Sequence, residues 1–159
     1  MNIKILCVGK IKEKFYRDAI AEYEKRLSRY CKLSIIEVAD EKTPDHSSET
    51  EELQIKGKEA ARLRSHIRDN DYVIALAING KTYDSVAFAE HLGQLAVSGK
   101  SNLVFVIGGS LGLHPSLLEQ CDELHSFSAM TFPHQLMRVI LLEQLYRSYR
   151  IRNHEPYHK

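Results

Sequence analysis

The sequence predicts a single α/β domain over residues 1–159, built on a parallel sheet with helices on both faces. Short aliphatic and β-branched runs alternate along the chain with longer segments in which apolar residues recur every three or four positions, and this alternation is typical of parallel sheets. The strand-like runs are nearly continuous in apolar residues, as expected for strands buried on both faces. With 159 residues, 43% of them hydrophobic, the chain is long enough to bury a sizeable core.

The first half of the chain is expected to contribute two strands and two helices. Residues 3–8 form a short β-prone run that a glycine stops. Over residues 13–30 the apolar side chains return at helical spacing, which predicts an amphipathic helix. A second strand is expected over residues 33–38, and a polar loop then leads into a charged helix over residues 49–68.

The second half repeats this alternation and introduces glycine at the strand ends. An apolar strand over residues 72–78 is expected to end at Asn79-Gly80, because this dipeptide favours turns. The most apolar strand, residues 103–107, runs directly into the glycine-rich segment Gly108–Gly112. The remaining expected elements are helices over 84–97 and 115–120, a weaker strand over 123–128, and a last helix from Pro133, which suits a first-turn position, to about Arg152.

The last helix is apolar around most of its circumference, whereas a surface helix would show one apolar stripe. Either it lies centrally in the domain, or it packs on the sheet with one side and on a second subunit with the other. The small size of the domain favours the second arrangement, a homodimer.

The net charge of +1 conceals an uneven distribution. Residues 1–32 hold nine Lys and Arg against four Asp and Glu, residues 37–59 hold three against eight, and residues 138–159 hold five against two. Two basic ends around an acidic middle permit a surface that binds polyanions without requiring one.

The composition also indicates a compartment. No apolar run approaches the roughly 18 residues of a membrane-spanning helix, and the first residues do not resemble a signal peptide. The three cysteines are Cys7, Cys31 and Cys121; they are odd in number and form no CxxC motif. A reduced, cytoplasmic protein is the simplest interpretation.

Three strand ends are candidates for a ligand site, because ligands of open parallel sheets bind beyond the carboxyl ends of the strands. They are the segments 78–80, 107–112 and 126–132, which are rich in small or polar residues. Glycine lets backbone N–H groups approach a ligand closely. Taken alone, however, a strand followed by glycines is more often a tight turn than a site.

A second function remains open because Gly108–Gly112 also matches the G-x-S-x-G pattern of hydrolase nucleophile elbows. Ser110 would then be the nucleophile, followed in order by Asp122 and His134. The short chain after the serine and the short domain argue against this alternative.

The histidines show no spacing typical of zinc sites, so no metal is expected. His134, beside Pro133, fits either a structural or a chemical role. The ending, residues 147–159, mixes cations with Tyr and His, which could contact phosphates and stack on an unpaired base. Its simplest interpretation is a frayed, solvated tail.

Several blocks together resemble the ribosomal RNA large subunit methyltransferase H family of the SPOUT class, over the whole chain and in order. The motifs that carry this resemblance are residues 3–9 with 10–14, the segment AEYEKRL at 21–27, FVIGGS at 105–110, SFSAMTFPH at 126–134, Arg138-Val139, Glu143-Gln144 and the ending Tyr157-His158-Lys159. The FVIGGS block at 105–110 and the S-x-M-T-F-P-H block at 128–134 are highly specific in combination.

The resemblance implies a homodimer with a C-terminal deep trefoil knot, using S-adenosyl-L-methionine to methylate N3 of a pseudouridine in large-subunit (23S) ribosomal RNA. It places the cofactor contacts on the three strand ends identified above, at Leu76, Gly108, Phe127, Ser128, Ala129, Met130, Thr131 and Phe132.

Methylation of this nitrogen needs a base, because N3 of pseudouridine carries a proton. The candidates are His134, just after the cofactor loop, and His158, in a tail that could cover the partner subunit's site. RNA is expected to meet a positive surface made by Lys10, Lys12, Lys14, Arg17, Arg138, Tyr157 and His158. A non-enzymatic ribosome-binding module is the third alternative.

Overall fold

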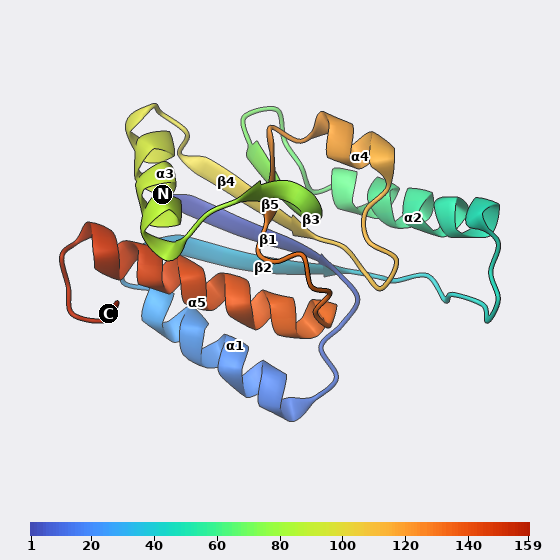
Figure 1. Cartoon of the computed structure of the whole chain (residues 1–159), viewed down its shortest axis with the longest axis horizontal. Coiled ribbons are helices and arrows are strands. Elements are labelled where there is room, and N and C mark those ends of the chain that lie inside the picture. Colours follow the sequence, from blue (N-terminus) through green and yellow to red (C-terminus); the bar gives the residue numbers. More distant parts are fainter.

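Five parallel strands in the order β2-β1-β4-β3-β5 form the centre of the computed structural model, which describes all 159 residues (Figure 1). The strands are β1 (Asn2–Val8), β2 (Lys32–Val38), β3 (Tyr72–Thr82), β4 (Asn102–Ile107) and β5 (Glu123–Ser126). The helices are α1 (Lys14–Leu27), α2 (Glu49–Arg64), α3 (Ser85–Val97), α4 (Pro115–Gln120) and α5 (His134–Arg152). The predicted α/β class with a parallel sheet is confirmed.

Helices cover both faces of the sheet, as the continuous apolar strands require. Ile5 and Phe105 belong to a core cluster that contains side chains of α1, α3 and α5. Their neighbours in sequence, Leu6 and Val106, belong to a second cluster with side chains of α2 and α4. Alternate residues of one strand thus enter opposite cores, which follows from the two-residue period of a strand.

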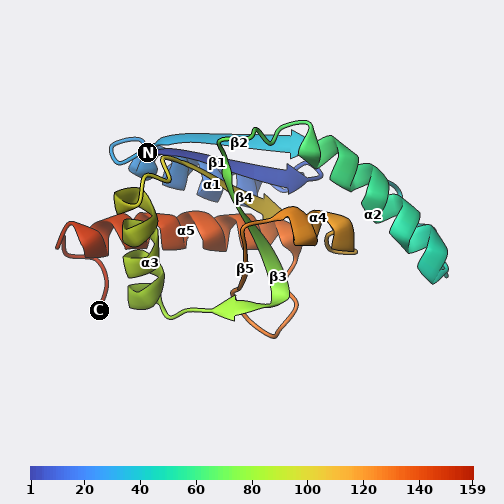
Figure 2. The same cartoon turned by 90° about the horizontal axis from the view of Figure 1, so that it is seen from above.

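Helix α5 lies centrally within one chain, between α1 and α3 and over the sheet (Figures 1 and 2). None of its residues is fully exposed. Tyr146 and Tyr149 contact the ring of Tyr30, which follows α1. Its own chain therefore covers much of the apolar circumference of this helix, while Leu136, Val139 and Ile140 stay partly exposed. The contact with a second subunit that the sequence favoured, in a homodimer, stays a prediction.

Strand β3 departs most from expectation, because it continues through Asn79-Gly80 to Thr82. Its pairing with β5 slips between Leu76 and Lys81, which both lie opposite His125. A Cβ atom on Gly80 would lie 2.7 Å from the backbone carbons of Leu124 and His125. The glycine therefore permits close contact of two strands instead of ending one (Figure 2 shows β3 turning before α3).

The other differences concern element ends. Helix α2 stops at Arg64 instead of residue 68, because Ser65 turns its hydroxyl onto the carbonyl of Arg62. Helix α1 ends at Leu27, and a turn from Leu27 to Tyr30 follows. Pro133 precedes α5 as its N-cap residue. None of the helices combines the length and apolarity needed to cross a bilayer. The trefoil knot stays a prediction.

Candidate functional site

The carboxyl ends of β3 and β4 and the segment after β5 surround one cavity of about 640 Å³. Leu76 comes from β3, Gly108 follows β4, and Phe127, Ser128, Met130, Thr131 and Phe132 follow β5. All of them line the cavity; of the residues expected to contact a cofactor, only Ala129 does not. The volume lies within the range of pockets that enclose a small organic ligand.

The glycine-rich wall of the cavity, residues 108–112, is a tight turn closed by a backbone hydrogen bond. Gly112 N–H donates to the Gly109 carbonyl at 3.0 Å, and Gly112 has a positive φ of 83°. A Cβ atom on Gly108 would lie 2.8 Å from the carbonyl carbon of Gly112. Both contacts involve backbone, so no side chain can move aside to make room. Glycine at position 108 is therefore required for this wall to form.

The opposite wall, residues 127–133, belongs to no helix or strand. Its shape is held locally, since Ser126 Oγ donates to the Ser128 carbonyl at 3.1 Å and Met130 N–H donates to Ser128 Oγ at 2.9 Å. The Pro133 carbonyl accepts from Met137 N–H at 3.0 Å, and no backbone–backbone hydrogen bond occupies residues 127–132. Backbone polar groups of this segment are therefore free to bond a ligand or water. Met130 is 73% exposed at the rim.

His134 begins α5 and lies half-buried in the lining of the cavity. Its Nε2 is 3.8 Å from the position of a Cβ atom on Gly9, at the end of β1. Burial, followed by the positive charge of Arg138, lowers the pKa of His134 below its ordinary value, and the Asp40 carboxylate opposes this shift. The imidazole is thereby kept neutral near pH 7, and a neutral imidazole can accept a proton.

Arg138 is 1% exposed, so its expected place on an RNA-binding surface is wrong. It donates to the carbonyls of Val8 and Gly9 at 3.0 and 2.6 Å and to Glu37 Oε2 at 2.6 Å. These bonds tie α5 to the ends of β1 and β2. The residue holds the backbone beside His134 in place.

The acidic residues around this point were not identified from the sequence. Glu37 Oε2 also accepts from Ile11 N–H at 3.1 Å and so orders the loop after β1. Glu59 is 5% exposed behind the glycine wall, where its Oε2 accepts from Glu41 N–H at 3.0 Å and burial raises its pKa. Their partners come from distant elements, so no local motif could have revealed them.

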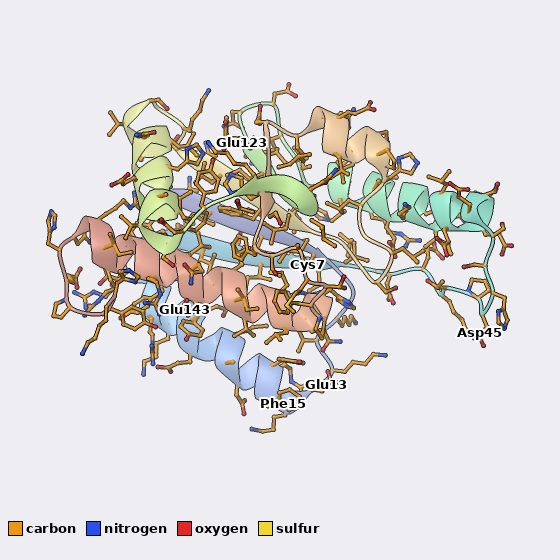
Figure 3. All side chains as sticks on the ribbon, in the orientation of Figure 1. Cys7, Glu13, Phe15, Asp45, Glu123 and Glu143 are labelled. Carbon is orange, nitrogen blue, oxygen red and sulfur yellow. The ribbon has the colours of Figure 1, made fainter.

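The expected RNA-binding cations after β1 lie at the cavity's edge of the sheet. Lys10, Lys12, Lys14 and Arg17 are exposed, and Arg17 donates to the Lys12 carbonyl at 2.6 Å. Because the loop begins at Gly9, next to His134, its cations lie near the cavity entrance. Figure 3 shows Phe15, 65% exposed, pointing outward from the same region.

The C-terminal tail folds back on α5 at the end far from the cavity. Tyr157 donates to Glu143 Oε1 at 3.1 Å and packs edge-on against Tyr146, and Arg147 Nη1 is 3.1 Å from His158 Nδ1. At 1.5 Å per residue, Arg147 lies about 20 Å from His134 along the helix. The tail is therefore ordered and not frayed, and one chain does not bring His158 to its own cavity.

The hydrolase alternative finds no triad. Ser110 is exposed and forms no hydrogen bond with His134, although both line the cavity. Asp122 is engaged elsewhere, because its Oδ2 accepts from Val73 N–H at 2.7 Å.

Comparison with known proteins agrees with this geometry. The family model described as "Predicted SPOUT methyltransferase" matches residues 1–158. Proteins named "Ribosomal RNA large subunit methyltransferase H" from Bifidobacterium adolescentis and Clostridium novyi are each 60% identical over 159 residues. The protein of the same name from Clostridium tetani is 59% identical. All three alignments cover 100% of both chains.

Solved structures show a related fold at low sequence identity. A methylase family protein from Haemophilus influenzae superimposes with a TM-score of 0.54 at 15% identity, covering 99% of this chain and 70% of the other. One from Neisseria gonorrhoeae gives a TM-score of 0.51 at 14% identity, covering 91% of this chain and 81% of the other.

Proposed function

Because this chain belongs to the SPOUT methyltransferase family, we propose that it transfers a methyl group from S-adenosyl-L-methionine to N3 of a pseudouridine in large-subunit (23S) ribosomal RNA. The observation that carries the proposal is the full-length match, at 60% identity, to proteins named for methylation of that RNA. The cavity lined by the predicted segments after β4 and β5 supports it.

The residues present fit the proposed cofactor. The cavity combines apolar side chains, such as Leu76 and Met137, with an irregular segment of backbone at Phe127–Phe132. Apolar walls suit the adenine ring, and free backbone polar groups suit its hydrogen-bonding edge and the ribose. The bare backbone at Gly108 would let the methionine part approach closely.

The bound cofactor would supply a methyl group attached to a sulfonium sulfur. A nucleophile attacks the methyl carbon in line with the carbon–sulfur bond, and the sulfur leaves as a neutral thioether. The protein would hold N3 of the pseudouridine in line with the methyl donor in the cavity, because such a reaction gains most from positioning. His134 follows the cofactor loop and lines the cavity, so it is our candidate to accept the N3 proton, and its lowered pKa keeps it in the accepting form. Arg138 positions the backbone next to it.

RNA would bind along the exposed cations Lys10, Lys12 and Arg17, whose phosphate contacts carry no base specificity of their own. The assembly is proposed to be a homodimer in which His158 and Tyr157 of one chain reach the cavity of the other. Ile78 and Met130 support a protein contact there, because these apolar residues are 59% and 73% exposed beside the cavity. A ribosomal substrate implies action in the cytoplasm.

The decisive experiment compares ribosomes from strains with and without the gene by mass spectrometry of nucleosides from the large-subunit RNA. The methylated pseudouridine should be absent without the gene and return when the purified protein and S-adenosyl-L-methionine are added. An unchanged nucleoside profile would leave the non-enzymatic module as the better explanation.

Cofactor binding is tested separately by isothermal titration of the purified protein. We expect binding to be abolished in Gly108→Ala, because the added Cβ would collide with the backbone of Gly112. Gly57→Ala is the matched control, since its added Cβ meets only the His114 ring at an ordinary 3.7 Å.

The hydrolase alternative is tested by a separate variant. Full activity of Ser110→Ala would exclude the serine as a nucleophile.

A further inference from the structure

Three side chains that could ligate a metal converge between α3 and β5. His91 and Glu123 lie outside the cofactor cavity, whereas His125 also belongs to its lining. His91 Nε2 lies 2.7 Å from Glu123 Oε1, and His125 Nε2 lies 3.7 Å from Glu123 Oε2. One ligand atom from each residue falls within 4.8 Å of the other two. Figure 3 labels Glu123 on the side of the sheet where α3 stands.

The two elements bring these residues together by their periodicity. Glu123 and His125 are two positions apart on β5, so their side chains leave the same face of the strand. His91 comes from α3, and its ring stacks on Tyr83 at 5.2 Å between centroids. Tyr83 also lies 4.9 Å from the His125 ring and so packs against both imidazoles. The histidine spacing in the sequence gave no sign of the cluster, because its two histidines lie in separate elements, α3 and β5.

The buried and unpartnered state of His125 is a second observation that points to a ligand at this cluster. It is 1% exposed, and neither of its ring nitrogens has a hydrogen-bond partner. A buried polar group without a partner costs roughly 1–3 kcal/mol. The nitrogen nearest to Glu123 would gain a partner if an ion lay between them.

Metal binding would require both imidazoles in their neutral form, so it should weaken on acidification. Glu123 supplies the one negative charge of the ligand set.

We propose that His91, Glu123 and His125 bind a divalent transition-metal ion of the zinc type. Two imidazoles and one carboxylate are a known zinc ligand set, with a fourth position left for water. The ion would join α3 to β5 immediately before the cofactor loop, since β5 ends at Ser126. Its role is to fix this strand, and the proposal does not depend on the methyltransferase function.

The test uses the untagged full-length protein, freed of metal with a chelator and titrated with Zn²⁺ by calorimetry and with Co²⁺ by visible absorption. We expect one ion per chain, a ligand-field band of a low-coordinate Co²⁺ site, and a higher Tm with Zn²⁺. His91→Asn and Glu123→Gln should each weaken binding at least about tenfold. His154→Asn is the matched control, because His154 is exposed and lies in a left-handed conformation that asparagine tolerates.

Two results would overturn the proposal. One is a wild-type protein that binds neither ion, in which case the cluster is a hydrogen-bonded histidine–carboxylate pair beside a buried imidazole. The other is binding that His91→Asn and Glu123→Gln leave unchanged while circular dichroism shows them folded. The wild-type titration decides the first point even if a variant fails to fold.

Discussion

His134 and Arg138 stand about one turn apart on α5, yet the structure gives them opposite roles. His134 lines the cavity and is half-buried, whereas Arg138 is wholly enclosed and bonds Val8, Gly9 and Glu37. A guanidinium that satisfies three acceptors at once fixes the ends of two strands. This difference separates a residue that can touch substrate from one that positions it.

The pH dependence of methyl transfer should report on His134. Its pKa lies below the ordinary value of about 6.5, so the rate should fall on acidification only below that pH, where the imidazole becomes protonated. In His134→Asn the acid limb should disappear and kcat should fall by roughly 10²-fold or more, with cofactor affinity unchanged. Single-turnover rates on ribosomes that lack the modification, measured between pH 5 and 8, check this.

The control is His154→Asn, whose side chain is exposed and remote from the cavity. Should His134→Asn keep both its rate and its acid limb, another group accepts the proton, and His134 is a structural residue.

At the scale of single residues, the sequence was informative about which residues line the cavity and misleading about which charged side chains are exposed. Gly108 could be predicted because a strand end followed by glycines is a local signal, whereas Leu76 was named by the resemblance alone; both line the cavity. Arg138 was assigned to a surface because its burial depends on Glu37, 101 positions away. Charge in a sequence does not reveal which cations are enclosed.

Among the elements, β3 and β5 together determine the shape of the site. The backbones touch at Gly80, and the cofactor segment Phe127–Phe132 starts directly after β5. Any displacement of β5 therefore moves this wall of the cavity. The contact also explains why β3 runs on past a dipeptide that usually ends strands.

Gly80→Ala should open this contact, because the new Cβ would meet backbone atoms at 2.7 Å. We expect a loss of about 1–3 kcal/mol in the free energy of unfolding, together with weaker cofactor binding. Urea denaturation and isothermal titration measure the two effects. Gly57→Ala in α2 should instead stabilise the protein by roughly 0.5–1 kcal/mol. Equal behaviour of the two variants would contradict the close packing at Gly80.

The elements themselves were largely predictable, since the strands are continuous apolar runs and helices such as α1 and α3 show regular apolar spacing. The errors concern their ends and partners. The apolar circumference of α5 could not show that α1 and α3 flank it on either side. Such neighbours depend on the strand order, which spacing along the chain does not encode.

At the scale of the whole molecule, the cavity and the C-terminal tail lie far apart within one chain. His158 is held beside Arg147, about 20 Å along α5 from His134, so the two proposed bases cannot serve one site within one chain. The proposed homodimer places two tails and two cavities in one particle, and the composite site requires each tail to reach the other chain's cavity.

Removal of Tyr157–Lys159 should abolish methylation while cofactor affinity stays nearly intact. Purified mixed dimers of this truncated chain with Gly108→Ala should regain about half of wild-type activity, because each holds one complete site of two; the unfractionated mixture should show about a quarter. Co-expression with two different affinity tags isolates the mixed dimers.

No recovery in the mixed dimers would mean that the tail serves its own chain. Full activity of the truncated homodimer would mean that the tail only packs against Tyr146 and Glu143. Either result removes the composite site from the proposal.

The central place of α5 has a consequence for the biosynthesis of the chain. Leu141, Leu142 and Leu145 complete a core whose other members begin at Ile3, so the first and last parts of the chain must meet before that core can close. While a ribosome is still translating the final codons, the nascent chain presents the uncovered face of a parallel sheet. Such long-range closure is slow. The protein is therefore expected to reach its native state only after release, and to need protection from aggregation until then.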